Sequence, residues 1–415
     1  MSKKGDRLFV ENGLASSYAR NKMAGIATKF LVGGMLLSGV CNTILNKLQD
    51  MQCVNNCDNP DPKKREYFEQ PVWQTLNMFI GETMCFVLVN YVPIESEGEE
   101  ESSSRIKIDE EVSGTTEELT GWKVLLFWLP TMADILGTTL MNVGLIYTSA
   151  SVYQMLRGAV VIFTAAFSII FLKRTLYAFH WASIFLVVLG VTIVGLSSVL
   201  FPPRKPSDSN LTTITKTEGI SDAAAALIGV FFVIIAQIFT ASQFVIEEKI
   251  MHKYRVEPLR AVGLEGIFGL ITVSVGMIIL HFIYGVTHPD GYFNISNGFH
   301  QIFDNAGIWQ TGVAICFSIA FFNFFGLSVT RTLSATARST IDTTRNLFIW
   351  IVALFLGWET FSWLQLIGFA ILVWGTFLFN GVVRPPSFLE PPAPAPGRRR
   401  PSSENAPLLT EPEHI

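Results

Sequence analysis

Ionisable side chains inside long apolar runs are the part of this sequence that could do chemistry. Several fall within the predicted spanning runs, among them Glu82, Asp134, Arg157, Glu265, Asp342 and Arg345. An ionised side chain at the centre of a lipid-facing helix costs roughly 2.5–3.5 kcal/mol on insertion scales. We therefore expect these side chains to face a polar cavity or one another, where they would bind a ligand or relay protons.

The run 334–357 carries the densest set of ionisable groups, because Arg338 lies at its start. Arg338, Asp342 and Arg345 are spaced i, i+4 and i+7, which places them on one face of a helix. Ser and Thr residues between them widen this polar surface. The spacing predicts a helix that turns one charged face towards a binding site.

The run 149–172 opens with a second polar patch, formed by Tyr153, Gln154 and Arg157. Arg157 has no acidic neighbour within one helical turn, so its charge must be met from another helix or by a ligand. Two interpretations stay open. Arg157 binds an anionic group in a central cavity, or it forms a structural ion pair with Asp342 that fixes helix packing and binds nothing.

The other carboxyls, Glu82, Asp134 and Glu265, are candidates for ligand binding or for a proton relay. The alternative is that each is hydrogen-bonded to a neighbouring helix. Asn323 could add a hydrogen bond to the same site, although such amides also join membrane helices. The sequence shows no metal-ligand spacing, no nucleophile constellation and no phosphate loop, so we expect no metal, no cofactor, no nucleic-acid partner and no enzymatic activity.

Composition predicts an all-α polytopic membrane protein. Of 415 residues, 50% are hydrophobic and only 15% are charged, whereas an average soluble domain carries roughly 25% charged residues. Apolar runs approach or exceed the roughly 20 residues that span a bilayer. We predict ten spans, at about 26–47, 70–92, 121–143, 149–172, 177–200, 222–246, 259–284, 308–330, 334–357 and 363–383.

The loops predict the orientation of these spans. Lys and Arg are concentrated in the tails and loops of one side, which therefore faces the cytosol and holds both termini. The glycosylation sequons at Asn210 and Asn294 fall on the opposite, luminal side. Cys53 and Cys57 fall there too, where a disulfide between them is permitted.

The chain repeats itself with an offset of 185 residues, which pairs "SAS" at 149–151 with "SAT" at 334–336 and Gly190 with Gly375. Each repeat would hold five spans, and this odd number would invert the second copy in the membrane. The predicted organisation is a tail (1–23), a first repeat (24–200) with an acidic cytosolic loop (93–120), a luminal loop (201–221), a second repeat (222–383) and a C-terminal tail (384–415).

Several of these stretches resemble a known family. "TSASVYQMLRGAVVIFTAAFSIIFLKRTL" resembles the end of the first repeat in the drug/metabolite transporter superfamily, and "VIEEKI" and "FFNFFGLSVTRTLSATAR" resemble solute carrier family 35, subfamily F, in its sixth-member branch. The resemblance implies ten helices in two inverted five-helix halves and transport by alternating access. It supplies no substrate, although relatives elsewhere in the family exchange nucleotide sugars for nucleotides across Golgi or endoplasmic reticulum membranes.

The C-terminal tail matches a sorting-signal pattern, and the alternative is that this tail is only an incidental solvated segment. Glu404, Leu408 and Leu409 fit the acidic dileucine pattern that clathrin adaptors bind in extended peptides, and the Pro-rich surroundings favour extension. The pattern predicts a lysosomal or vacuolar membrane, with the Golgi and the mitochondrion as alternatives.

Three functions stay open at this point. The first is a secondary-active transporter of a small organic solute, coupled to protons because carboxyls outnumber arginines deep in the predicted spans. The second is a nucleotide-sugar exchanger, for which paired arginines suit diphosphates. The third is a membrane scaffold or regulator that transports nothing. The expected partners are a small-molecule substrate, membrane lipids and clathrin adaptors, and the sequence says nothing of oligomeric state.

Overall fold

The structure is a computed structural model. It describes residues 3–59, 65–91, 117–147, 153, 156–200, 222–288, 291, 293–358, 361–386 and 389. The helices that follow predicted spans are α1 (Lys3–Asp50), α2 (Pro71–Tyr91), α4 (Trp128–Tyr147), α6 (Val160–Leu172), α7 (Ala178–Leu200), α8 (Asp222–Lys253), α9 (Pro258–Leu280), α11 (Ala306–Thr332), α12 (Ala335–Phe355) and α13 (Trp363–Phe379). A 3₁₀ turn, η2 (Gly121–Phe127), leads into α4, and a π-helical turn, η3 (His281–Gly285), ends α9.

Six helical stretches in the described residues are long and apolar enough to cross a membrane: Ile26–Asp50, Gly121–Gly144, Ala178–Ser197, Leu227–Lys253, Pro258–Gly285 and Ala306–Thr332. Two shorter helices, α6 and α13, are equally apolar in character. The 21-residue α12 falls outside this set because three ionisable residues interrupt it. The prediction of a helical, polytopic membrane protein is confirmed.

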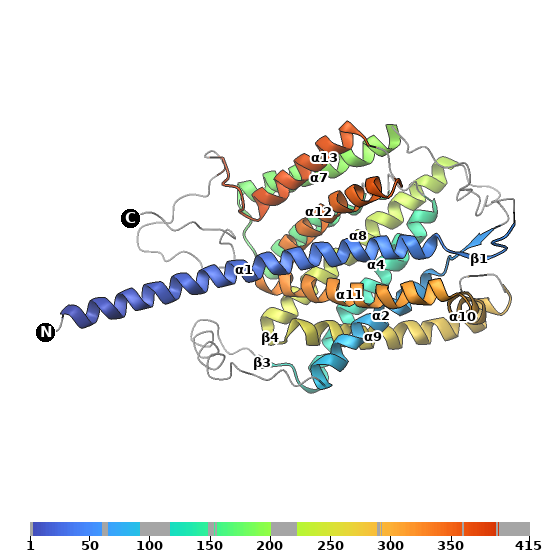
Figure 1. Ribbon diagram of the computed structural model, residues 1–415, viewed down its shortest axis with the longest axis horizontal. Coiled ribbons are helices and arrows are strands. Elements are labelled where there is room, and N and C mark those ends of the chain that lie inside the picture. Colours follow the sequence, from blue (N-terminus) through green and yellow to red (C-terminus); the bar gives the residue numbers. More distant parts are fainter. Residues whose placement is uncertain are drawn as a thin grey trace.

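The bundle has two distinct ends (Figure 1). At the terminal side, as we call it, α1 begins, α13 ends and the parallel pair β3 (Glu117–Glu118) and β4 (Tyr254–Arg255) lies. At the hairpin side lie α10 (Ile295–Phe303) and the antiparallel pair β1 (Cys53–Asn55) and β2 (Glu66–Tyr67). In Figure 1 α1 runs from the terminal side to the hairpin side, and α8 runs the opposite way.

Two local features of the hairpin side lie between the helices that follow predicted spans. A disulfide joins Cys53 to Cys57 and closes the turn after β1. The short helix α10 lies in the loop after α9, where the Asn294 side chain accepts hydrogen bonds from the backbone N–H groups of Ser296 and Asn297. An Asn at this position caps a helix N-terminus, and the same residue is the predicted glycan acceptor.

Close packing of α2 on α9 sets the depth of their polar residues. A Cβ on Gly266 of α9 would collide with the backbone of Glu82 and Thr83, so only glycine permits this approach. The neighbouring residue, Glu265, is thereby held beside Glu82. The glycine at position 266 therefore has a direct consequence for the candidate site.

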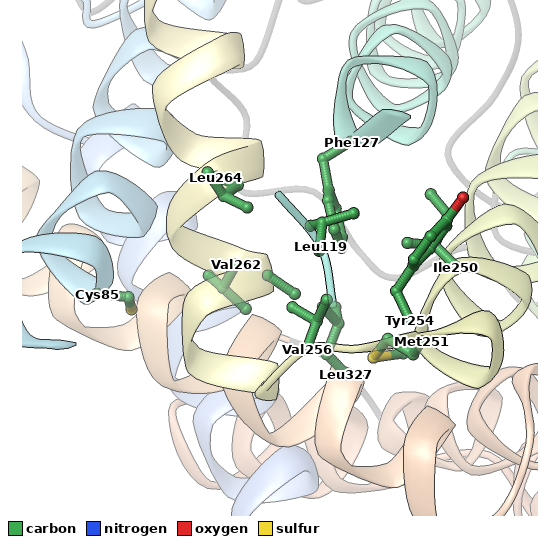
Figure 2. Packing of buried hydrophobic residues seen from close by; sticks show 11 residues of the cluster. Cys85, Leu119, Phe127, Ile250, Met251, Tyr254, Val256, Val262, Leu264 and Leu327 are labelled. Carbon is green, nitrogen blue, oxygen red and sulfur yellow. The ribbon is translucent and has the colours of Figure 1, made fainter. Parts of the chain in front are cut away.

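An apolar cluster closes the terminal side next to these carboxyls (Figure 2). It is built from the end of α8, the start of α9 and the segment that enters α4, and Phe127, Tyr254 and Val256 are among its buried members. Leu264 belongs to it and directly precedes Glu265. The first turns of α9 therefore contribute to both the apolar cluster and the group of carboxyls.

Candidate functional site

Five helices bring four carboxyls and one arginine together in the interior, and we call this group the charged cluster. Its members are Glu82 of α2, Asp134 of α4, Glu247 of α8, Glu265 of α9 and Arg338 of α12. Every member except Asp134 is at most 5% exposed. Asp134 is partly exposed.

Most members of the charged cluster have a specific partner. Arg338 Nη1 lies 2.5 Å from Glu247 Oε2, and its guanidinium also covers the ring of Phe244 at 4.1 Å. The Asn323 side chain donates a hydrogen bond to Glu82 Oε1. The Asn323 side chain therefore joins α11 to the cluster, as the sequence suggested for a hydrogen-bonding amide.

Glu265 is the exception in the charged cluster. Its Oε1 is buried and has no hydrogen-bond partner in the part of the chain that the structure describes. Its charge interacts with the other three carboxyls and with Arg338, which is already paired to Glu247. Four carboxyls against one guanidinium leave three negative charges uncompensated when all are ionised, and such charges repel strongly in a medium of low dielectric constant.

A second polar group lies further along α12. We call it the arginine pair, because Arg157 and Arg345 lie close together in it beside Asp342. Arg345 Nε is 3.4 Å from Asp342 Oδ1 of the same helix, and the Arg345 guanidinium lies over the Phe322 ring at 4.8 Å. Arg157 lies near enough to Arg345 for their charges to interact, and it lies over the Tyr153 ring at 5.8 Å.

The structure therefore divides the three ionisable residues of α12 between two sites. Arg338 turns to the charged cluster, whereas Asp342 and Arg345 pair with each other. Among the contacts of the described residues, Asp342 has Arg345 as its ionic partner and Arg157 has none. Gln154, predicted for the same patch, lies outside the described residues.

We expect the substitution Arg157→Gln to change the free energy of unfolding by no more than about 1 kcal/mol. The side chain is only partly buried, and a cation–π contact at such a site contributes roughly that much. Thermal unfolding in detergent measures it, with Arg157→Lys as the charge-preserving control. A loss of several kcal/mol in the Gln variant alone would instead establish a structural ion pair.

Two neighbouring carboxyls of α8 were missed by the sequence analysis, and both hold the first turn of α12. Glu247 pairs with Arg338, while Glu248 Oε2 accepts a hydrogen bond of 2.7 Å from the backbone N–H of Ala335. Glu248 Oε1 also lies 2.5 Å from Arg174 Nη2, which follows the end of α6. The predicted span ended at residue 246, one position before this pair, whereas α8 continues to Lys253.

A signal for these carboxyls was present in the sequence. Apolar residues continue past Glu247 at Ile250 and Met251, both of which are buried. That spacing keeps one apolar face on the helix for another turn. The predicted sequon Asn210 and the sorting residues Glu404, Leu408 and Leu409 lie outside the described residues.

Known proteins resemble this chain in sequence and in fold. The sequence model of the nucleotide-sugar transporter family matches residues 63–294 of the chain. The chain belongs to the nucleotide-sugar transporter family. The segment matched by this nucleotide-sugar transporter family model includes all four carboxyls of the charged cluster and ends before α12, which carries Arg338.

Individual relatives match over most of their length. Human solute carrier family 35 member F6 is 37% identical over 360 residues, which cover 86% of this chain and 89% of the human protein. The mouse protein of the same name is 36% identical over the same shares. An uncharacterised protein of Schizosaccharomyces pombe is 36% identical over 85% of this chain and 97% of its own. The resemblance to solute carrier family 35, subfamily F, is confirmed.

The fold also has a counterpart among solved structures. A protein crystal structure matches 85% of this chain and 96% of its own, with a TM-score of 0.51 and 11% sequence identity. At that identity the likeness concerns the fold alone. Membership of the family, by contrast, identifies this chain as a membrane transporter.

Proposed function

We propose that the protein is a secondary-active, proton-coupled transporter that moves a small organic solute across an endolysosomal membrane by alternating access. The charged cluster carries this proposal. Burying four carboxyls near one arginine in a membrane protein is costly, and a purely structural network would pair them all. Glu265, which is buried with an unpartnered Oε1, is instead suited to take up and release a proton.

Alternating access is supported by the way the helices pair. We propose that α1, α2, α4, α6 and α7 form one repeat and that α8, α9, α11, α12 and α13 form the other. The first helix of each repeat then packs on the third helix of the other, since α1 lies along α11 and α8 lies along α4. A pseudo-twofold axis that relates the two inverted repeats turns each of these two contacts into the other.

The packing of α7 on α13 supports the same axis at the level of single residues. A Cβ on Gly190 would contact Leu372, and a Cβ on Gly375 would contact Val187. The offset of 185 that relates Gly190 to Gly375 also relates Val187 to Leu372. Each contact is therefore the symmetry mate of the other.

A nucleotide-sugar exchanger is the second candidate function, and the arginine pair favours it. Arg157 and Arg345 lie close together, with one carboxylate, Asp342, against them. Two guanidinium groups in this arrangement suit a diphosphate. The excess negative charge of the charged cluster argues against it, because an anionic substrate would have to pass near that group.

Metabolite profiling of isolated lysosomes tests the proposed function. Lysosomes from cells that lack the protein should accumulate or lose one small organic solute, and expression of the wild-type chain should reverse the change. The same solute should then enter proteoliposomes faster when a pH gradient is imposed. Unchanged lysosomal content together with a pH-independent exchange of nucleotide sugars would favour the second candidate. A scaffold would show neither.

The C-terminal tail predicts the organelle. We expect the double substitution Leu408→Ala, Leu409→Ala to move the protein from lysosomes to the plasma membrane, because clathrin adaptors bind the two leucines in an apolar slot. Imaging against a lysosomal marker measures the change, with Leu389→Ala, outside the signal, as the control. Lysosomal localisation that persists in the double variant would remove the tail from the targeting argument.

A further inference from the structure

An apolar groove of about 300 Å³ lies between α1 and α13, with α12 as its floor. Val32 and Gly33 of α1 and Phe377 of α13 line its walls, and Ile341 of α12 lies at its base. Gly33 is exposed and Phe377 is 42% exposed, so the groove opens on the outside of the bundle. In a membrane, that outer surface faces lipid.

The polar groups at the base of the groove are already satisfied by one another. Thr344 Oγ1 donates to Thr376 Oγ1 at 3.2 Å, and Asn380 Nδ2 donates to the Thr376 carbonyl at 2.8 Å. A polar solute such as a nucleotide would therefore find few free hydrogen-bond groups there. The groove suits a hydrocarbon chain.

One cationic side chain lies at the groove. Lys29 lines it and is exposed, and it lies three residues after Ile26, where the apolar part of α1 begins. Three residues of helix rise by about 4.5 Å, which places Lys29 near the level of lipid headgroups. A lysine at this depth extends its ammonium group towards the interface.

We infer that this groove binds one membrane phospholipid, with an acyl chain between α1 and α13 and its phosphate against Lys29. Basic residues beside gaps between membrane helices are known features of lipid-headgroup recognition. The ligand class follows from the two parts of the site together, because a hydrocarbon groove ends at a single positive charge. The inference does not depend on the transported solute or on the direction of transport.

Native mass spectrometry of the full chain released from phosphatidylserine-containing nanodiscs tests the inference. A Cβ on Gly33 would meet no heavy atom within 4 Å, so Gly33→Phe fills the groove without a backbone collision. This variant should lose most of its retained phospholipid. Gly276 of α9 has the same free space and lines a different surface, so Gly276→Phe is the matched control and should keep it.

A second variant keeps the test independent of any folding defect. Lys29 is exposed, and Lys29→Gln should lower the affinity for phospholipid about fivefold, the effect of one basic residue near a membrane surface. Unchanged occupancy in both the Gly33→Phe and Lys29→Gln variants would overturn the inference. Equal loss in the Gly276→Phe control would also overturn it, as would a shift from dimer to monomer in Gly33→Phe, which would assign the groove to a second copy of the chain.

Discussion

Replacing Arg338 with Gln is expected to lower the free energy of unfolding by about 3–5 kcal/mol, because it leaves Glu247 as a buried charge without its partner. Both side chains are at most 2% exposed, so water cannot take over the role of the guanidinium. The other carboxyls of the charged cluster then repel Glu247 with no cation among them. Thermal unfolding in detergent at neutral pH measures this loss.

Two further variants separate the ion pair from a general effect of losing an arginine. Arg260 of α9 is exposed, and Arg260→Gln should change stability by less than about 0.5 kcal/mol. The double substitution Arg338→Gln, Glu247→Gln should recover much of the loss, since it removes both members of the pair. A double variant as unstable as Arg338→Gln alone would show that the guanidinium stabilises the fold through its contact with Phe244 instead.

Much of the fold could be predicted from the sequence because apolar length and period are local properties. Each predicted span has a helix at its position, and the sequence identified most members of the charged cluster as ionisable residues in apolar surroundings. Short elements were missed for the opposite reason. The nine residues of α10 and the two-residue strands β3 and β4 carry too little periodic pattern to distinguish them from loops.

The partners within the site could not be predicted, because they depend on the depth at which helices pack. Asn323 meets Glu82 across 241 positions of the chain. A Cβ on Gly81 would collide with the backbone of Cys316, and this close approach of α2 to α11 sets the register that brings the two side chains together. Nothing in the local sequence of either helix states that register.

The partner of Asp342 could not be predicted either. Its spacing from Arg338 and Arg345 is compatible with either neighbour on one helix face, and also with a partner on another helix. In the structure Asp342 pairs with Arg345, whereas Arg338 pairs with Glu247. The prediction that Arg157 contributes to a substrate site stays a prediction.

Glu265→Gln is expected to abolish the response of transport to a pH gradient while the protein stays folded. An amide has nearly the size of a carboxyl but does not take up or release a proton between neutral and acidic pH. The variant therefore removes the coupling proton that we assign to Glu265. Its Oε1 has no hydrogen-bond partner in the described chain and lies among three other carboxyls. Neutralising it should therefore leave stability unchanged or raise it.

The matched control is Glu248→Gln on α8, because Glu248 is as deeply buried but is paired with Arg174 and caps α12. Losing that ion pair should cost several kcal/mol, roughly 3–5 for a buried pair with one partner removed. Infrared difference spectra between neutral and acidic pH add a substrate-independent measurement. The carbonyl stretching band of a protonated carboxylic acid should weaken in Glu265→Gln and persist in Glu404→Gln. If that band is unchanged and Glu265→Gln unfolds as readily as Glu248→Gln, then Glu265 is a structural carboxyl and the coupling proton is carried elsewhere in the charged cluster.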